Sequence, residues 1–180
     1  MRPILFVNGA VLAIISLPLL IIEMLNRGAD QPFLKAFGMI IFVGLGLMLA
    51  ARGGSIRFSN KQIFVLTASI WVTLTSAATL PFWIYGMSLS DAVFEATSGI
   101  TTTGATVLVG LDDLPNSILM WRAFLQWLGG IGIVVTAIAL LPFLGIGGMQ
   151  LFRTESSETS EKELPSAAKL ASTTMWYIWF

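Results

Sequence analysis

Four apolar runs, each long enough to cross a lipid bilayer, constrain this chain more than any other feature of its sequence. They extend over residues 4–25, 33–51, 63–85 and 118–144. A transmembrane helix needs about 20 predominantly apolar residues, because the hydrocarbon core is about 30 Å thick and each helical residue rises 1.5 Å. In a chain with 56% hydrophobic and 11% charged residues, the runs predict an all-α integral membrane protein embedded in the lipid bilayer.

The first apolar run has the basic start of a signal peptide, because Arg2 precedes it. It is longer than the apolar region of a typical signal peptide, and no small-residue cleavage site follows it. We therefore expect a spanning helix that pairs with the second run. Residues 1–60 would then form a leading two-helix hairpin followed by a basic cytoplasmic loop.

The chain contains neither histidine nor cysteine. Their absence excludes disulfides, zinc sites built on imidazole or thiolate, and Ser–His or Cys–His nucleophile pairs. Asp91 and Glu95 form the one clustered carboxylate pair that an intramembrane enzyme could use, but no basic or nucleophilic residue accompanies them. We expect a protein that is not an enzyme, holds no covalently bound cofactor and contacts no nucleic acid directly.

The basic residues predict the orientation of the spans, because lysine and arginine concentrate on the cytoplasmic side. With a cytoplasmic N-terminus, seven of them lie inside and three lie outside or at the outer edge, namely Arg27, Lys35 and Arg122. The acidic residues between the third and fourth runs then face outward, where they would attract cations. For Asp112 and Asp113 an ordinary solvated loop is the alternative.

The stretch "SGITTTGATV", Ser98 to Val107, places five hydroxyl side chains and two glycines between the third and fourth runs. The preceding "SLSDAVFEATSG" carries helix-start signals, with Ser88 and Ser90 as candidate caps and Asp91 in the first turn. We expect a re-entrant pore helix of about eight residues that ends at Gly99. Such a helix is too short to cross the membrane, and its unpaired terminal carbonyls would point at the segment that follows.

The segment after this helix is expected to form an extended filter strand. Threonines favour extended backbone, and Gly104 permits dihedral angles that other residues resist. Extended backbone survives at membrane depth only where it lines an aqueous cavity, so successive carbonyls could replace the water around a cation. The alternatives are a polar external hairpin and a threonine-rich strand.

The motif "FEATSGITTTGATV" followed by "WRAFLQWLGGIGIVV" resembles the first filter repeat of the TrkH/KtrB/HKT superfamily of potassium transporters. The whole chain is similar to the N-terminal portion of TrkH. The resemblance implies four membrane-pore-membrane repeats around one cation pathway, preceded by two additional helices. Residues 61–150 would be the first repeat, 151–165 a cytoplasmic linker, and 166–180 the incomplete start of a second repeat.

The same resemblance implies a potassium site made of backbone carbonyls. The carbonyls of Thr102 and Thr103 would face the ion, with Thr101, Gly104 and Ala105 adjoining. Glycine at the position of Gly104 is associated in the family with a preference for potassium.

Three residues are candidates for supporting the pore loop: Glu95, Arg122 and Gln126. Arg122 and Gln126 lie one helical turn apart, and Arg122 could pair with Glu95 or with Asp112. The alternative for the pair on the last span is anchoring at the membrane interface beside the neighbouring tryptophans, Trp121 and Trp127. Close helix packing is expected at Gly129, Gly130 and Gly132, with a gating hinge as the alternative.

The resemblance implies potassium uptake across the bacterial inner membrane, with this chain as part of the ion-translocating subunit. It also implies a homodimer and a cytoplasmic, nucleotide-binding regulatory subunit of the TrkA type. The last apolar run, from Ala167, has 14 residues, about 21 Å of helix, so we expect the chain to be the front portion of a longer protein. One filter strand of four would not conduct selectively alone, and the alternative function is a non-conducting fragment or a membrane assembly module.

Overall fold

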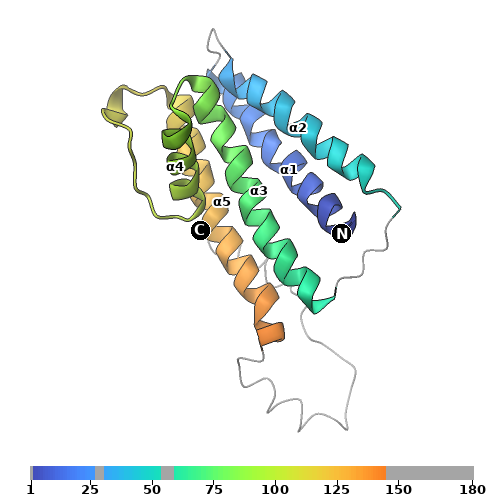
Figure 1. The fold of residues 1–180 in the computed structure, drawn as a ribbon. Helices are drawn as coiled ribbons and strands as arrows, with labels where there is room; N and C mark the ends of the chain where they lie inside the picture. Colours follow the sequence, from blue (N-terminus) through green and yellow to red (C-terminus); the bar gives the residue numbers. More distant parts are fainter. Residues whose placement is uncertain (1, 27–30, 54–58, 145–180) are drawn as a thin grey trace, which may run out of the picture. The chain divides into compact units, whose positions relative to one another are not determined.

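The computed structural model describes residues 2–26, 31–53 and 59–144, and the regular structure within these ranges is entirely helical. Four helices are long and apolar enough to span a membrane: α1 (Arg2–Asn26), α2 (Pro32–Ala50), α3 (Asn60–Tyr85) and α5 (Asn116–Leu144). Between α3 and α5 lie a shorter helix, α4 (Leu89–Ile100), and one turn of 3-10 helix, η1 (Leu111–Asp113). This order of elements (Figure 1) confirms the expected all-α, multi-pass membrane fold.

The chain divides into two compact units, residues 1–130 and 131–180. The first unit contains α1 to α4, η1 and the beginning of α5, and it holds every residue of the candidate site. Of the second unit, the structure describes the remainder of α5 to Leu144. The linker predicted over 151–165 and the repeat start predicted over 166–180 lie outside the described residues.

Helices α1 and α2 form the predicted hairpin and pack backbone to backbone (Figure 1). A Cβ built on Gly9 would stand 2.6 Å from the carbonyl oxygen of Gly44, and one built on Gly44 would stand 2.9 Å from that of Gly9. Glycines at a crossing let two membrane helices approach this closely. The observed ends of both helices lie within two residues of the predicted ones.

The start of α2 is closed by a side chain from α1. Gln31, which precedes α2, has φ 45 and makes no capping hydrogen bond of its own. Instead, Oε2 of Glu23 accepts a hydrogen bond from the backbone N–H of Phe33 at 3.1 Å. A carboxylate is favourable there because the N-terminus of a helix carries partial positive charge. Glu23 is buried, so its carboxylate caps α2 from inside the hairpin.

Helix α3 has clear signals at both ends. A capping box opens it, in which Ser59 and Gln62 exchange side-chain to backbone hydrogen bonds. Gly86 closes it at φ 114, and the amides of Gly86 and Met87 bond to carbonyls in the last helical turn. Glycine suits this left-handed position because it has no Cβ. The tight ending lets α4 begin almost at once and pack against α3.

Helix α4 begins where the sequence predicted but is longer than expected. Ser88 is its N-cap and accepts from the amide of Asp91 at 3.2 Å. The expected end at Gly99 lies one residue from the observed end at Ile100, but the expected length of about eight residues is wrong, because the helix has 12 residues. Glycine at position 99 allows α5 to pack closely on α4, because an added methyl group would stand 2.9 Å from the Cβ of Leu125. At about 18 Å, α4 is still too short to cross a membrane.

Trp121 on α5 is the centre of the core in the first unit. It is fully buried, and its Nε1 donates to the carbonyl of Ala78 on α3 at 3.2 Å. Its ring meets Phe33 of α2 edge-on and stacks on Phe124. Trp121 therefore joins three helices inside the first unit, whereas Trp127 is exposed.

Candidate functional site

The end of α4 lies deep along the neighbouring span α5. Gly129 faces the backbone of Ile100 so closely that a Cβ on Gly129 would collide with the Ile100 carbonyl oxygen. Gly129 comes 13 residues after Asn116, the first residue of α5, which is about 20 Å along the helix axis. The chain therefore runs along α4 and turns back about 20 Å from the N-terminal end of α5.

Contacts with α3 place the turn at a similar depth. Thr101 lines a shallow cavity together with four α3 residues, Trp71, Val72, Thr75 and Ser76. Thr75 lies ten residues before Tyr85, the last residue of α3, which corresponds to about 15 Å of helix. The threonine segment thus lies beside the middle part of two helices that are long and apolar enough to span a membrane.

The threonines close the end of α4. The amides of Thr101, Thr102 and Thr103 donate to the carbonyls of Thr97, Gly99 and Ser98 at 2.9, 3.0 and 3.0 Å. The expectation that these terminal carbonyls stay unpaired is therefore wrong. The reason is a Schellman-type ending, in which the chain folds back so that its next amides satisfy the last turn.

The extended backbone expected over Thr101 to Thr103 is also wrong for Thr102, which has φ 57. A Schellman ending requires one left-handed residue, and glycine usually occupies that position. A β-branched residue there is strained, at a cost of about 1–3 kcal/mol. The strain is offset by the hydrogen bonds that this turn provides, because the amides of Thr102 and Thr103 pair the last carbonyls of α4.

Beyond Thr103 the chain has no regular structure up to Leu108, and its carbonyls differ in their partners. The carbonyl of Ala105 accepts from Oγ of Ser98 at 2.6 Å, and that of Thr101 accepts from the Thr102 hydroxyl at 2.7 Å. The carbonyls of Thr102, Thr103 and Gly104 accept no hydrogen bond from the part of the chain that the structure describes. Three successive carbonyls are thus left for another partner.

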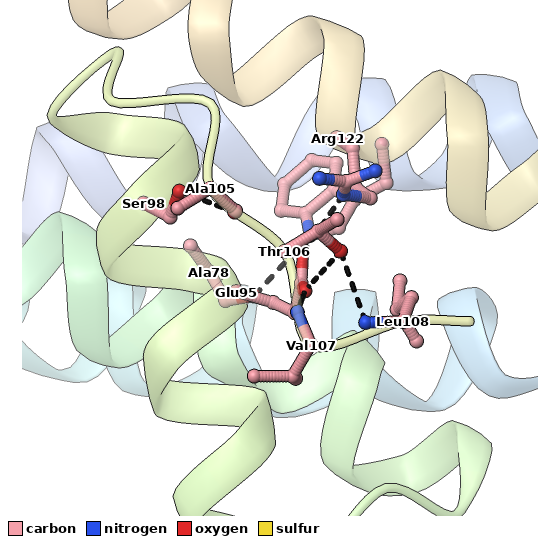
Figure 2. Close-up of polar contacts among 9 residues, drawn as sticks. Ala78, Glu95, Ser98, Ala105, Thr106, Val107, Leu108 and Arg122 are labelled. Atoms are coloured by element: carbon pink, nitrogen blue, oxygen red, sulfur yellow. Dashed lines mark hydrogen bonds and ion pairs between the residues drawn. The ribbon is translucent and has the colours of Figure 1, made fainter. Parts of the chain in front are cut away.

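Glu95 connects α4, the threonine segment and α5. Its Oε1 accepts from Oγ1 of Thr106 at 2.5 Å and from the amide of Val107 at 2.7 Å. Its Oε2 accepts from Nε of Arg122 at 2.8 Å. Figure 2 shows Glu95 between the loop residues and Arg122. Of the two carboxylates considered for Arg122, the structure pairs it with Glu95, while Asp112 is exposed on η1.

The Glu95–Arg122 pair is largely removed from solvent, with side-chain exposures of 0% and 13%. A buried carboxylate needs several donors to offset its lost hydration, and Glu95 has three. Both carboxylate oxygens of Glu95 accept hydrogen bonds from other residues of the chain. The carboxylate of Asp91 accepts a hydrogen bond from Oγ of Ser88 at 2.7 Å. The two carboxylates that an enzyme could have used are therefore engaged in structural hydrogen bonds.

The other predicted support residues lie close to the same segment. Nε2 of Gln126 would stand 3.8 Å from a Cβ on Gly104, so Gln126 lies next to the loop, while Arg122, one helical turn earlier, reaches the loop only through Glu95. Gly129 makes the close packing expected of it. Gly130 has more room, because the nearest atom to an added Cβ is Cγ2 of Thr102 at 4.0 Å.

Ser98 and Thr106 were missed by sequence reasoning, although each binds another part of the site. A usable signal exists for Ser98, because it lies three residues after Glu95 and residues with this spacing share one face of a helix. Thr106 has no such signal, since its partner Glu95 lies on a different element. Only the folded loop brings them together.

Comparison with known proteins gives one consistent family. The profile of the TrkH family, described as "Cation transport protein", matches residues 29–180. The Trk system potassium uptake protein TrkH of Vibrio parahaemolyticus is 41% identical over 187 residues, covering 99% of this chain and 38% of the relative. TrkI of Halomonas elongata, also named a potassium uptake protein, is 43% identical over 183 residues, covering 96% of this chain and 36% of that protein.

The fold agrees with these sequence matches. The crystal structure of the potassium transporter TrkH from Vibrio parahaemolyticus superposes with a TM-score of 0.81 at 38% identity, covering 99% of this chain and 36% of that chain. The present chain thus spans little more than a third of the length of these relatives. By sequence and by fold, the chain belongs to the TrkH family of cation transport proteins.

Proposed function

We propose that this chain supplies the first membrane-pore-membrane repeat, and so one side of the ion filter, of a protein that takes up potassium across the bacterial inner membrane. The carbonyls of Thr102, Thr103 and Gly104 would coordinate the dehydrated ion. Thr101 and Ala105 would flank this site with carbonyls already bonded within the chain. Glu95, Arg122 and Gln126 would support the loop.

One observation carries the proposal: irregular backbone, with three carbonyls that accept no hydrogen bond from the described residues, lies beside the middle part of two candidate membrane spans. Unpaired backbone groups in hydrocarbon cost several kcal/mol each, so such a segment persists only in protein or beside water. The side chains from Thr101 to Val107 are exposed. A water-filled cation pathway on this side would satisfy the carbonyls, since rings of carbonyl oxygens replace the hydration shell of potassium.

The relatives support potassium as the ion, because those compared are named potassium uptake proteins. This chain spans only 38% of the Vibrio relative, so the filter would be completed by further repeats. A homodimer and a nucleotide-binding regulatory subunit of the TrkA type are proposed on the family resemblance. A non-conducting assembly module is the alternative, favoured only by the small share of the relatives that the chain covers.

The test uses a chimera in which residues 1–180 replace the aligned segment of the Vibrio parahaemolyticus relative. In cells that lack their own potassium uptake systems, the chimera is expected to take up rubidium, and residues 1–180 alone are not. Gly104→Ser should lower the preference for rubidium over sodium about tenfold. A side chain at φ +75 is strained by about 1–2 kcal/mol, and relaxing that strain would turn the carbonyls.

The matched control is Gly110→Ser, in the same loop. Gly110 has φ +67 and similar room, so it carries comparable strain without contributing a proposed ligand. Rubidium uptake in competition with sodium is measured at equal membrane abundance. An equal loss of selectivity in both variants would contradict the placement of the filter, and a chimera without uptake would favour the assembly module.

The orientation of the chain is a separate prediction. The N-terminus is proposed to be cytoplasmic, which puts the loop after α2 inside and η1 outside, as the distribution of basic residues favours. Alkaline phosphatase fused after Ser59 should be inactive, and after Asp113 it should be active, because the enzyme folds only outside the cytoplasm. The reverse pattern would mean that the topology is inverted.

A further inference from the structure

Ser98 holds the proposed ion-binding segment at both ends. Its carbonyl accepts from the amide of Thr103 at 3.0 Å, and its hydroxyl donates to the carbonyl of Ala105 at 2.6 Å. The three residues from Thr103 to Ala105 therefore form an arc closed on a single residue of α4. Gly104, with its left-handed φ of 75, is the middle of that arc.

The hydroxyl of Ser98 bonds to a residue beyond its own helix, unlike most serine and threonine hydroxyls in the described helices. Serine and threonine inside a helix usually donate to a carbonyl of their own preceding turn. Within the described helices, five residues donate to the carbonyl four residues earlier, namely Thr67, Thr75, Ser76, Thr79 and Thr97. Ser98 donates instead to a residue seven positions later, outside the helix. It is also nearly buried, at 6% exposure.

The bond from Ser98 decides which carbonyls can turn toward an ion. Because the Ser98 hydroxyl donates to the Ala105 oxygen, the Ala105 carbonyl is already hydrogen-bonded and is not available to an ion. It also fixes the position of the chain just after Gly104, so the carbonyls of Thr103 and Gly104 lie between two anchored points. A second anchor follows at Glu95, which holds Thr106 and Val107.

We propose that Ser98 is a positioning residue for cation selectivity, acting by holding the Ala105 carbonyl away from the ion and fixing the arc that presents the Thr103 and Gly104 carbonyls. This proposal rests on the proposed function of the segment. Its distinctive consequence is a change in ion preference that does not follow from the amount of folded protein. Loss of the hydroxyl would free the Ala105 carbonyl and loosen one end of the arc.

The experiment compares three variants in the chimera that carries the full chain. Ser98→Ala removes the hydroxyl, and Ser98→Cys keeps nearly the same volume with a much weaker donor. Thr97→Ala is the control, because it removes a neighbouring hydroxyl that bonds only within α4. Rubidium uptake is measured against increasing sodium, together with membrane abundance and melting temperature in detergent.

Ser98→Ala is expected to lower the rubidium preference about tenfold, which corresponds to about 1.4 kcal/mol, and Ser98→Cys by a smaller factor. Thr97→Ala should leave the preference unchanged. If Ser98→Ala fails to fold, a reduced rubidium preference in Ser98→Cys, even by the smaller factor, still supports the proposal. A fall in abundance with unchanged ion preference would show a merely structural role and overturn it.

The experiment distinguishes failure of the proposed role of Ser98 from failure of the proposed potassium-uptake function. Unchanged preference in both Ser98 variants, with a reduced preference in Gly104→Ser, would overturn the role of Ser98 alone. Absence of rubidium uptake by the unsubstituted chimera would overturn the proposed function and this proposal with it.

Discussion

Gly129→Ala is expected to remove most of the folded protein. The added methyl group would overlap the Ile100 carbonyl oxygen and stand 2.8 Å from its carbon. Both atoms belong to backbone at the end of α4, where no flexible side chain can move aside. Overpacking a well-filled interior costs about 1–3 kcal/mol, and a clash with backbone lies at or above the upper end of that range.

The adjacent glycine gives a closely matched control. Gly130→Ala makes the same change on the same helix, but its nearest neighbour would lie at 4.0 Å. Alanine favours helix over glycine by about 1 kcal/mol at either position, so the difference between the two variants reports the contact with Ile100. The measurement is the yield and melting temperature of the detergent-solubilised protein. Equal behaviour of the two variants would mean that α5 does not press on the end of α4.

Arg122→Gln is expected to destabilise the folded chain by about 3–5 kcal/mol. Removing one partner of a buried ion pair leaves the other charge without compensation, and Glu95 is fully buried in this case. The loss should also release the segment around Thr106 and Val107, because the same carboxylate holds both residues. Rubidium uptake by the chimera should fall with the stability.

A double-mutant cycle separates the interaction free energy of the Glu95–Arg122 pair from the contribution of each side chain alone. Glu95→Gln combined with Arg122→Gln removes both charges, so the double variant should lose less stability than the sum of the two single variants. Arg52→Gln is the control, because Arg52 is exposed at the end of α2 and should change stability by no more than about 0.5 kcal/mol. Strictly additive losses would show that Glu95 and Arg122 do not interact in the folded protein.

The spans could be predicted from the sequence because length and apolar composition alone define them. The start of α4 was also predictable, since Ser88 and Asp91 form a local cap. Its end was predicted to within one residue, but the close packing of Gly99 on Leu125 was not. That contact joins two helices 26 positions apart in the sequence, so no local pattern indicates it.

The threonine segment after α4 was also predicted incompletely from local sequence. Threonine prefers extended backbone, yet Thr102 is left-handed because the end of α4 needs hydrogen-bond donors. The sequence left two partners open for Arg122, and only the folded chain chooses Glu95. The bond between Ser98 and Ala105 was missed because serine in a helix normally bonds to its own helix. These choices depend on which donors and acceptors remain unpaired after folding.

The cap that Glu23 of α1 provides for α2 bears on how the protein is made. The ribosome synthesises Glu23 before Phe33, so the acceptor already exists when the first amides of α2 emerge. In a nascent chain entering the bilayer, that order spares α2 an interval in which its first amide has no partner. The closing contact of the leading hairpin lies within the hairpin itself, so this contact does not depend on any later segment of the polypeptide.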